Sequence, residues 1–570
     1  MKKHLSGIQE LLFSAVESAG FEVEEGDVKL DKTKTIEHGH LASNVAMLIA
    51  GKTGARPREV AEAIVAQLKS PLIAKVEVAG PGFINLFIEQ KFYSDELQSI
   101  TGNLDKYLKE IVGLKKKKTM VIDYSHPNIA KPMGVHHLLT TVIGDSIKKT
   151  YKRLGWKVIA DNFIGDMGTQ FGKLMVAIKQ WGNMDDIEKN PIPTLHKLYV
   201  QYHMEADKDV ELDDEGRAEY KKFEDGDKNS RKLWEKIREW SLKEIQVIYD
   251  RLNIDFDYMN GESFYEDKMG PILEAGRKQG IIVEGEKGAW IIQPDDPADT
   301  PVLLKKSDGT TLYATRDLAR IDYWEKTWHP DLMVNVVDTA QEFHFRQLFF
   351  ASSKLGLTKA QNVHVSFGRM LGMSTRTGNV LLLTDLLDEA ETRALALAKE
   401  KGESLNEKEQ IALSKIMGVG SIKYSILAPA RTTNINFDWN KTLSFEGNSA
   451  PYLMYTIARA RSVVRKSGFT GGDIEAFDFT PQIDAETQVA LDLIAYPSVL
   501  ERAADEFKPN HLATYLYELA QDFNHFYNGN PVIKAETEAL QKSRLLLTAA
   551  VVTVMSDGFA LLGLEVPERM

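Results

Sequence analysis

Residues 119–146 read "TMVIDYSHPNIAKPMGVHHLLTTVIGDS" and decide the fold of the chain. The apolar run "MVIDY" is typical of a buried strand, and a helix is predicted to begin near Leu138. Pro127 and Pro132 hold the intervening loop extended, and Gly134 lets the backbone approach a ligand. Open α/β sheets bind ligands where a strand ends and a helix begins, because the helix amides favour phosphate. The stretch therefore predicts a nucleotide site.

Two adjacent histidines, His136 and His137, stand at the start of this predicted helix. A half-buried histidine with satisfied hydrogen bonds is an equal alternative to a nucleotide-binding role for His137. A metal site is disfavoured, because neighbouring side chains on a helix point in different directions. The pair alone leaves the first two alternatives open.

Further short apolar runs, separated by helical segments, follow the same pattern. They predict a doubly wound parallel sheet of the Rossmann-like type, with helices on both faces. A charge-rich region at about 183–290 contains long amphipathic helices and is interpreted as an insertion. The later strand candidates are "KVIAD" (157–161), "LMVNVVD" (332–338) and "NVHVSFG" (362–368).

The ends of the chain differ from this pattern and predict a multidomain α/β and all-α protein. Residues 1–114 are expected to form a small α/β domain, with two strands around the Gly-Pro-Gly turn in "IAKVEVAGPGFINLFIE" (73–89). Residues 115–404 hold the predicted sheet. From about residue 405 strand signals vanish, and residues 405–570 predict a helical bundle.

Composition limits the class of protein. A chain of 570 residues is too long for one core, and the absence of cysteine excludes disulfides and thiolate zinc sites. The net charge of −12 argues against a generic nucleic-acid binder unless basic groups are segregated. No apolar run reaches the ~18 residues that span a bilayer, and the N-terminus has no unbroken apolar core. We expect a cytoplasmic protein that binds no membrane.

Three more stretches carry polar groups at strand or helix ends. Tyr313 and Asp317 in "KKSDGTTLYATRDLARIDYW" (305–324) are four residues apart, so a helix puts them on one face. They form either a structural pair or a pocket for a cationic planar group. Gln341 follows a buried strand and opens a helix. The polar loop of "GRMLGMSTRTGNVLLL" (368–383) carries a cation, although by itself an ordinary surface hairpin is the better interpretation.

In order and spacing, these stretches resemble the arginyl-tRNA synthetases, a family of class I aminoacyl-tRNA synthetases. The similarity covers essentially the whole chain. It implies an enzyme that joins L-arginine to ATP as arginyl-adenylate and then transfers the arginyl group to the terminal ribose of its tRNA. Magnesium is expected to accompany ATP, and a monomer is expected. The further similar segments are "EHGHLASNVAML" (37–48), "GPGFINLFI" (80–88), "IGDMGTQFG" (164–172), residues 437–466 and "LGLEVPERM" (562–570).

The resemblance implies an arginine pocket. Asp123 and Asp317 would hold the guanidinium, with Tyr313 packed beside it, and Asn128 and Gln341 would meet the α-amino and carboxyl ends. Carboxylates suit a planar five-donor group because they accept paired, charge-assisted hydrogen bonds. Lysine, a point charge, would fit poorly.

The nucleotide side departs from the family pattern His-Val-Gly-His, because the chain has Gly134, Val135, His136 and His137 there. His137 matches the second histidine of the pattern and is assigned a catalytic and ATP-binding role. We hypothesise that the two changes compensate: Gly134 makes room, and His136 or His126 supplies the missing donor.

The family's loop lysines are also absent. Met373 and Ser374 are expected to bind ATP, and Arg376 is the remaining loop cation. Lys131 matches a lysine that substitutes for the loop lysine in some members, so the predicted catalytic groups are Lys131, His137 and Arg376. No dedicated metal site is predicted.

The resemblance implies that the first domain binds the elbow of the tRNA and that the last domain binds its anticodon. Arg461 and Arg465 lie at i and i+4 on a predicted helix, which is consistent with contact to the nucleic-acid backbone. A solvated helix face is the open alternative. Two rival functions also remain: another nucleotide-activating α/β transferase, and an inactive relative that binds tRNA without charging it.

Overall fold

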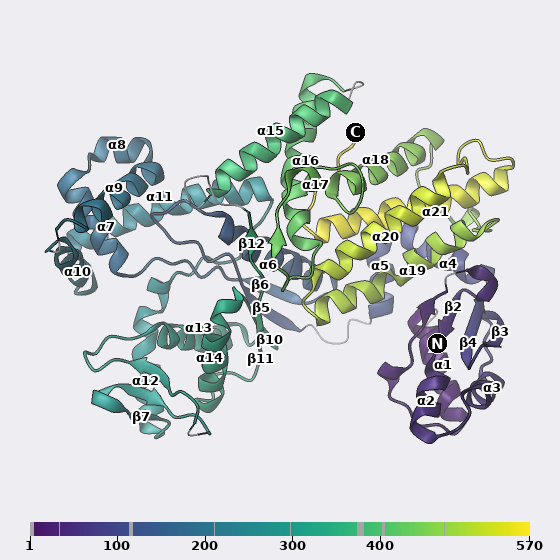
Figure 1. The fold of residues 1–570 in the computed structure, drawn as a ribbon, viewed down its shortest axis with the longest axis horizontal. Helices are drawn as coiled ribbons and strands as arrows, with labels where there is room; N and C mark the ends of the chain where they lie inside the picture. Colours follow the sequence, from purple (N-terminus) through teal and green to yellow (C-terminus); the bar gives the residue numbers. More distant parts are fainter. Residues whose placement is uncertain are drawn as a thin grey trace. The chain divides into compact units, whose positions relative to one another are not determined.

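The computed structural model describes residues 5–33, 35–112, 118–209, 211–296, 298–372, 381–401, 405–471 and 474–570. Its contacts divide the chain into two units. One is Lys116–Leu443, and the other combines Met1–Lys115 with Ser444–Met570. Figure 1 shows the helices and strands of both units.

Four parallel strands form the central sheet of the Lys116–Leu443 unit. Their order is β11-β10-β5-β6, so β5 continues to β6 on one side and β10 continues to β11 on the other. The strand order therefore reverses between β5 and β10, which is where doubly wound sheets bind ligands. The strands are β5 (Thr119–Asp123), β6 (Lys157–Ala160), β10 (Leu332–Val336) and β11 (Gln361–Val365).

Helices cover both faces of this sheet, as predicted. The helix α6 (Val135–Arg153) packs on β5, β6 and β10, and begins three residues before the predicted start. On the other face, α13 (Tyr313–Trp328) and α14 (Glu342–Lys354) share a core with Val121 and Met333. Every residue of β10 is buried, which is typical of a strand covered on both sides.

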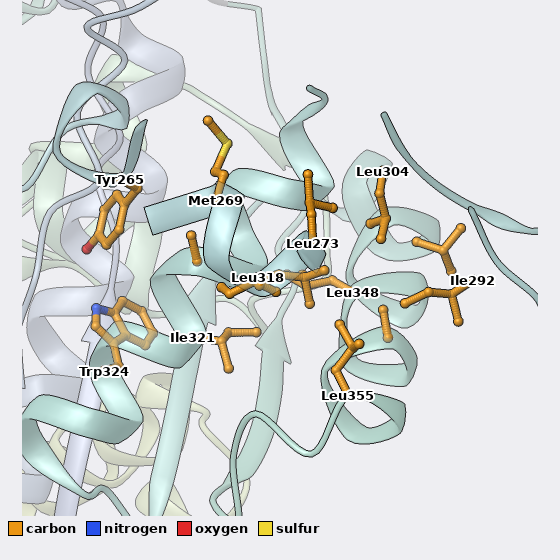
Figure 2. Close-up of a cluster of buried hydrophobic side chains, with 14 of the residues drawn as sticks. Tyr265, Met269, Leu273, Ile292, Leu304, Leu318, Ile321, Trp324, Leu348 and Leu355 are labelled. Atoms are coloured by element: carbon orange, nitrogen blue, oxygen red, sulfur yellow. The ribbon is translucent and has the colours of Figure 1, made fainter. Parts of the chain in front are cut away.

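The core on the α13 face is apolar, with two polar atoms at one edge. Figure 2 shows the Tyr265 hydroxyl and the Trp324 ring nitrogen on the same side of the cluster. Both donate to Asp161 Oδ2, over 3.1 and 2.9 Å. The core therefore adjoins a buried polar region at the end of β6.

The predicted insertion, at about 183–290, is mostly helical. It packs with one helix before it and shares a small antiparallel sheet with one strand after it. The helices α7 to α11 pack around one apolar cluster, and α12 packs on α13. Their bounds are α7 (Thr169–Trp181), α8 (Met184–Lys189), α9 (Pro191–Ala206), α10 (Glu211–Glu224), α11 (Lys228–Leu252) and α12 (Glu266–Lys278), and the strands are β7 (Ile282–Glu284), β8 (Trp290–Ile292) and β9 (Val302–Lys305).

The segment after the sheet holds α15 (Leu383–Lys401), α16 (Glu407–Leu427) and the short α17 (Trp439–Thr442). The helix α16 packs on α15 and α6, so its contacts lie with the sheet unit. Among the described residues after 405, where no strand was expected, one strand is present: β13 (Ile435–Asn436) pairs with β12 (Met370–Leu371). The domain limits 1–114, 115–404 and 405–570 stay a prediction.

In the other unit, the Gly-Pro-Gly turn joins β3 (Ile73–Ala79) and β4 (Phe83–Ile88) as an antiparallel hairpin, which confirms the predicted strands. The sheet order is β1-β2-β4-β3. The other elements of this region are α1 (Leu5–Ser18), β1 (Asp31–Lys32), β2 (Leu41–Ser43), α2 (Val45–Thr53), α3 (Pro57–Gln67), α4 (Gln90–Gly102) and α5 (Leu104–Val112).

Of the region predicted as a bundle, 405–570, α16 and α17 belong to the sheet unit. The other unit contains α18 (Ala450–Ser467), α19 (Asp484–Asp505), α20 (Pro509–Tyr527) and α21 (Glu538–Leu561). Within the described ranges, α21 is the helix that is long and apolar enough to cross a membrane, and 72% of its most apolar window is buried. Its neighbours are α18, α19, α20 and α4. That burial is typical of a central bundle helix.

Candidate active site

The candidate site lies at the carboxyl ends of β5 and β10. Asp123 is the last residue of β5 and is aligned with Asn335 of β10. Both side chains are buried. The sheet therefore presents a carboxylate and an amide side by side at the point where its strand order reverses.

The loop between β5 and α6 is held in an unusual backbone shape. Ser125, His126 and Ala130 have φ angles of 85°, 53° and 63°, in the left-handed region that non-glycine residues seldom adopt. Such strain persists only where surrounding groups hold it. The Ser125 amide donates to Thr140 Oγ1 over 3.1 Å, and the Ala130 amide donates to Ser241 Oγ over 2.9 Å.

Asp123 and Asp317 come together around one buried side chain, that of Arg320. Arg320 Nη1 donates to Asp123 Oδ2, and Nη2 donates to Asp317 Oδ1 over 3.0 Å. Nη2 also donates to Asn335 Oδ1 over 2.9 Å. The two predicted guanidinium ligands thus converge, and a guanidinium of the chain lies between them.

The charges of this cluster support one another. Burial alone would raise the pKa of Asp123, but His126, Arg320 and the backbone amide of Phe163 outweigh it and hold the pKa below its usual value. His126 Nε2 lies 2.9 Å from Asp123 Oδ2, and the Phe163 amide donates to Oδ1 over 3.1 Å. Both oxygens of Asp123 are therefore engaged by the chain itself.

Asp317 is more accessible than Asp123. It lies on α13 one turn after Tyr313, whose side chain is 71% exposed, so the predicted shared face exists. His344 Nε2 lies 2.8 Å from Asp317 Oδ2. Gln341 ends the short 3-10 helix before α14 and is exposed, as expected for a residue that opens a helix. Both oxygens of Asp317 therefore have partners in the chain, Arg320 at Oδ1 and His344 at Oδ2.

Asn128 is positioned by a glycine. The segment at Asn128 pairs with Gly165, and a Cβ at Gly165 would lie 2.2 Å from Asn128 Oδ1. That separation is far below contact distance, so residue 165 must be glycine for this side chain to keep its place. "IGDMGTQFG" was singled out in the sequence, and this contact gives its first glycine a physical role.

A second pair of charges beside Asp317 was missed in the sequence. Arg316 Nη1 donates to Glu262 Oε1 over 3.1 Å, and the Met167 amide donates to Glu262 Oε2 over 3.2 Å. Burial raises the pKa of Glu262 above its usual value. Glu262 lies in the 3-10 helix Glu262–Tyr265 of the insertion. Because that region is rich in charges, the sequence does not indicate which of its carboxylates is buried.

The paired histidines lie at the start of α6. The Gly134 amide donates to His137 Nδ1 over 3.2 Å, and the two imidazole rings are 3.9 Å apart. Burial, with a contribution from His136, lowers the pKa of His137 to about 3. His137 is therefore neutral at physiological pH, and because Nδ1 accepts, Nε2 carries the proton. Burial also lowers the pKa of the His136 ring, which is exposed in part.

Lys131 lies in the same loop, and its ammonium is 4.7 Å from the ring centre of Tyr199 on α9. Met373, Ser374 and Arg376 lie outside the described residues. The segment that follows them is described: the Val135 amide donates to Leu381 O over 3.2 Å. The chain therefore leaves that loop directly beside the start of α6.

Arg461 and Arg465 both lie on α18, as predicted, but in different surroundings. Arg461 Nη2 donates to Ser556 Oγ of α21 over 3.1 Å, and burial lowers its pKa. Arg465 is exposed. Across the described ranges, no group of three or more His, Asp or Glu side chains is arranged to hold a metal ion.

Comparison with known proteins covers almost the whole chain. Residues 99–439 match the family model of the class I tRNA synthetase (R) catalytic domain, residues 453–570 the DALR anticodon binding domain, and residues 6–88 the arginyl tRNA synthetase N terminal domain. The arginine–tRNA ligase of Fusobacterium nucleatum subsp. nucleatum is 39% identical, and the alignment covers 93% of each chain. The chain belongs to the arginyl-tRNA synthetase family. It is therefore an enzyme of the class I group.

Other relatives agree with this membership. The arginine–tRNA ligase of Exiguobacterium sp. is 39% identical, with 96% of each chain covered. Among solved structures, the arginyl-tRNA synthetase of Plasmodium falciparum superposes with a TM-score of 0.84 at 24% identity, over 99% of each chain. That of Thermus thermophilus gives 0.80 at 22% identity, over 99% of this chain and 100% of its own. These two likenesses support the fold, and the family rests on the closer relatives.

Proposed function

We infer that the protein is an arginine–tRNA ligase. It activates L-arginine with ATP, giving arginyl-adenylate and pyrophosphate, and transfers the arginyl group to the 3′-terminal ribose of its tRNA. The observation that carries this conclusion is a family relationship over nearly the full length, joined to a buried acidic cluster at the switch point of the sheet.

On the arginine side, Asp317 accepts hydrogen bonds from the substrate guanidinium and Tyr313 packs beside it. Two observations support this role: Asp317 lies one helical turn after the exposed Tyr313, and it is 8% exposed whereas Asp123 is 1% exposed. Asn128 meets the α-amino group, and Gln341 meets the carboxylate. Asp123 is buried and engaged by the chain, so it contributes its charge from behind Arg320.

On the ATP side, the start of α6 holds the nucleotide. The positive end of the helix dipole favours phosphate, and His137 offers its Nε2–H as a donor. Gly134 leaves room for the base, and the ring of His136 packs or donates beside it. A carboxylate oxygen of arginine attacks the α-phosphorus as the bond to pyrophosphate breaks. Lys131 and Arg376 neutralise the developing charge, and Met373 and Ser374 contribute contacts from the same loop as Arg376.

Magnesium fits this site as an ion carried by ATP. The described residues offer no ready cluster of ligands for it, and Mg²⁺ commonly keeps waters and substrate phosphates as ligands. No step is derived through it. The tRNA contacts the bundle through Arg465 and Arg461, and the protein acts as a cytoplasmic monomer that binds no membrane.

Aminoacylation of tRNA with each amino acid in turn tests the function. We expect charging with arginine and none with lysine, since a point charge makes fewer paired hydrogen bonds with Asp317. Pyrophosphate exchange, with and without tRNA, separates activation from transfer. Charging with another amino acid would contradict the arginine assignment, and tRNA binding without exchange or charging would identify an inactive relative.

A further inference from the structure

Arg320 is the most deeply buried cation near the reaction centre. It comes from α13, and its side chain is 2% exposed. The guanidinium lies 4.7 Å from the ring centre of Phe163 and 4.8 Å from that of Trp324, so two aromatic rings border it. Its partners are the end of β5, the end of β10 and Asp317.

This arrangement uses the same chemistry that the pocket requires for its substrate. A guanidinium binds carboxylates through paired donors in one plane, and Arg320 gives one amino group to Asp123 and the other to Asp317. When the neighbouring His126 and His344 are neutral, the two carboxylates and one guanidinium leave one net negative charge. That charge matches a single further cation, such as the side chain of one arginine.

Stability is a weak explanation for this cluster. Buried ion pairs are often no more stabilising than apolar groups of the same size, because desolvation offsets the attraction. Here Arg320 Nε and Asn335 Nδ2 are also buried with no hydrogen-bond partner among the described residues. The cluster therefore carries the free-energy cost of buried donors without hydrogen bonds, which an apolar core would not have.

We propose that Arg320 is a positioning residue that determines how the amino acid is recognised. It occupies the inner guanidinium site between Asp123 and Asp317, and so holds the Asp317 carboxylate toward the pocket. A substrate guanidinium then meets Asp317 only from the outer side, which fixes how deep the substrate enters. This inference rests on the proposed function.

The depth matters because arginine must present its carboxylate to the α-phosphate of ATP. Without Arg320, the space between the two carboxylates would accept the substrate's own guanidinium. The substrate would then lie deeper, and its carboxylate would be withdrawn from the reacting phosphorus. Positional errors of this kind reduce rates strongly in reactions that depend on orientation.

The test is Arg320→Ala with chemical rescue in the full-length enzyme. We expect kcat/KM for arginine to fall by about 100-fold, because removing one partner leaves two buried carboxylates uncompensated. The KM for ATP should change by less than about twofold. Guanidinium chloride at millimolar concentration should restore at least about tenfold of the loss by filling the vacated site, whereas urea, which has a similar shape without the charge, should not.

Two variants keep the test decisive. Arg320→Lys keeps the charge but offers a point donor, so we expect a fall in kcat/KM for arginine even if Arg320→Ala does not fold. Arg544→Ala breaks another buried ion pair, in which Arg544 Nε lies 2.7 Å from Glu486 Oε1. This variant should lower thermal stability. It should show no change in the KM for arginine that added guanidinium could reverse.

The inference is overturned if Arg320→Lys matches the unaltered enzyme in kcat/KM for arginine. It is also overturned if a folded Arg320→Ala variant shows equal losses in kcat/KM for arginine and for ATP, and if guanidinium and urea change these values to the same extent. Failure of the proposed function is a separate outcome, since it would show in the unaltered enzyme as no charging of tRNA with arginine.

Discussion

Asp123 and Asp317 bind opposite amino groups of one guanidinium, that of Arg320. The first ends a central strand and the second lies on a helix much later in the chain. Their meeting shows that the end of β5 and the first turns of α13 border one acidic region.

Asp317→Asn should raise the KM for arginine. Loss of the charge weakens a charge-assisted hydrogen bond by about 1.5–3 kcal/mol, which corresponds to roughly 10- to 100-fold in affinity. Steady-state aminoacylation measures it. Asp322→Asn is the matched control on the same helix, because Asp322 pairs with the exposed Lys326 and surface pairs contribute little. A KM for arginine equal to that of the control would show that Asp317 does not bind the substrate.

Gly165→Ala should impair arginine use by displacing Asn128. The added Cβ would lie 2.2 Å from Asn128 Oδ1. Loss of one hydrogen bond to the substrate predicts a fall in kcat/KM for arginine on the order of 10-fold. Gly270→Ala adds the same methyl group where nothing lies within 4 Å, and should leave kinetics unchanged. Equal effects of the two changes would contradict the role of Asn128.

Lys131→Ala should slow adenylate formation with little effect on arginine affinity. Removal of one charge-stabilising group commonly costs about 10²- to 10³-fold in rate. Pyrophosphate exchange in the presence of tRNA gives the rate. Lys236→Ala is a control in the same unit, since Lys236 also lies over an aromatic ring, that of Trp240, and pairs with Glu188. A mild change in rate for Lys131→Ala would refute its catalytic role.

Exchanging the residues at 134 and 136 tests whether their identities compensate. Gly134 has φ −90° and ψ 165°, which a histidine adopts without strain. We expect Gly134→His combined with His136→Gly to raise the KM for ATP, because the His136 ring now lies 3.9 Å from His137 and would be lost. Unchanged ATP use in adenylate formation would show that the exchange has no mechanistic meaning.

His137 should make the protein less stable in acid. Its pKa is about 3 in the folded state, while an unfolded histidine titrates near pH 6.5. Between these values the unfolded chain binds the extra proton, so stability falls as pH drops, by up to about 1.4 kcal/mol per pH unit. His137→Gln should reduce this acid dependence of the melting temperature, and His38→Gln, an exposed site, should not. Identical pH profiles for both variants would contradict the burial argument.

The sequence alone determined the sheet, the order of its strands along the chain and the helices that carry the site. Strands such as β10 are recognisable because burial on both faces demands an unbroken apolar run. The hairpin around Gly-Pro-Gly was recognisable because turn residues interrupt two alternating patterns. The order and spacing of the motifs were enough to indicate the family. The roles that the resemblance implies for Asp317 and Asn128 stay predictions.

Only the tertiary structure revealed the contacts of Arg320. In sequence it is a cation three residues after Asp317, which is the spacing of an ordinary surface pair on a helix. Its burial depends on which face of α13 meets the ends of β5 and β10, and local patterns contain no information about that contact. The same holds for Glu262 and His344, because a side chain's partners are fixed by packing between distant segments rather than by its neighbours in the chain.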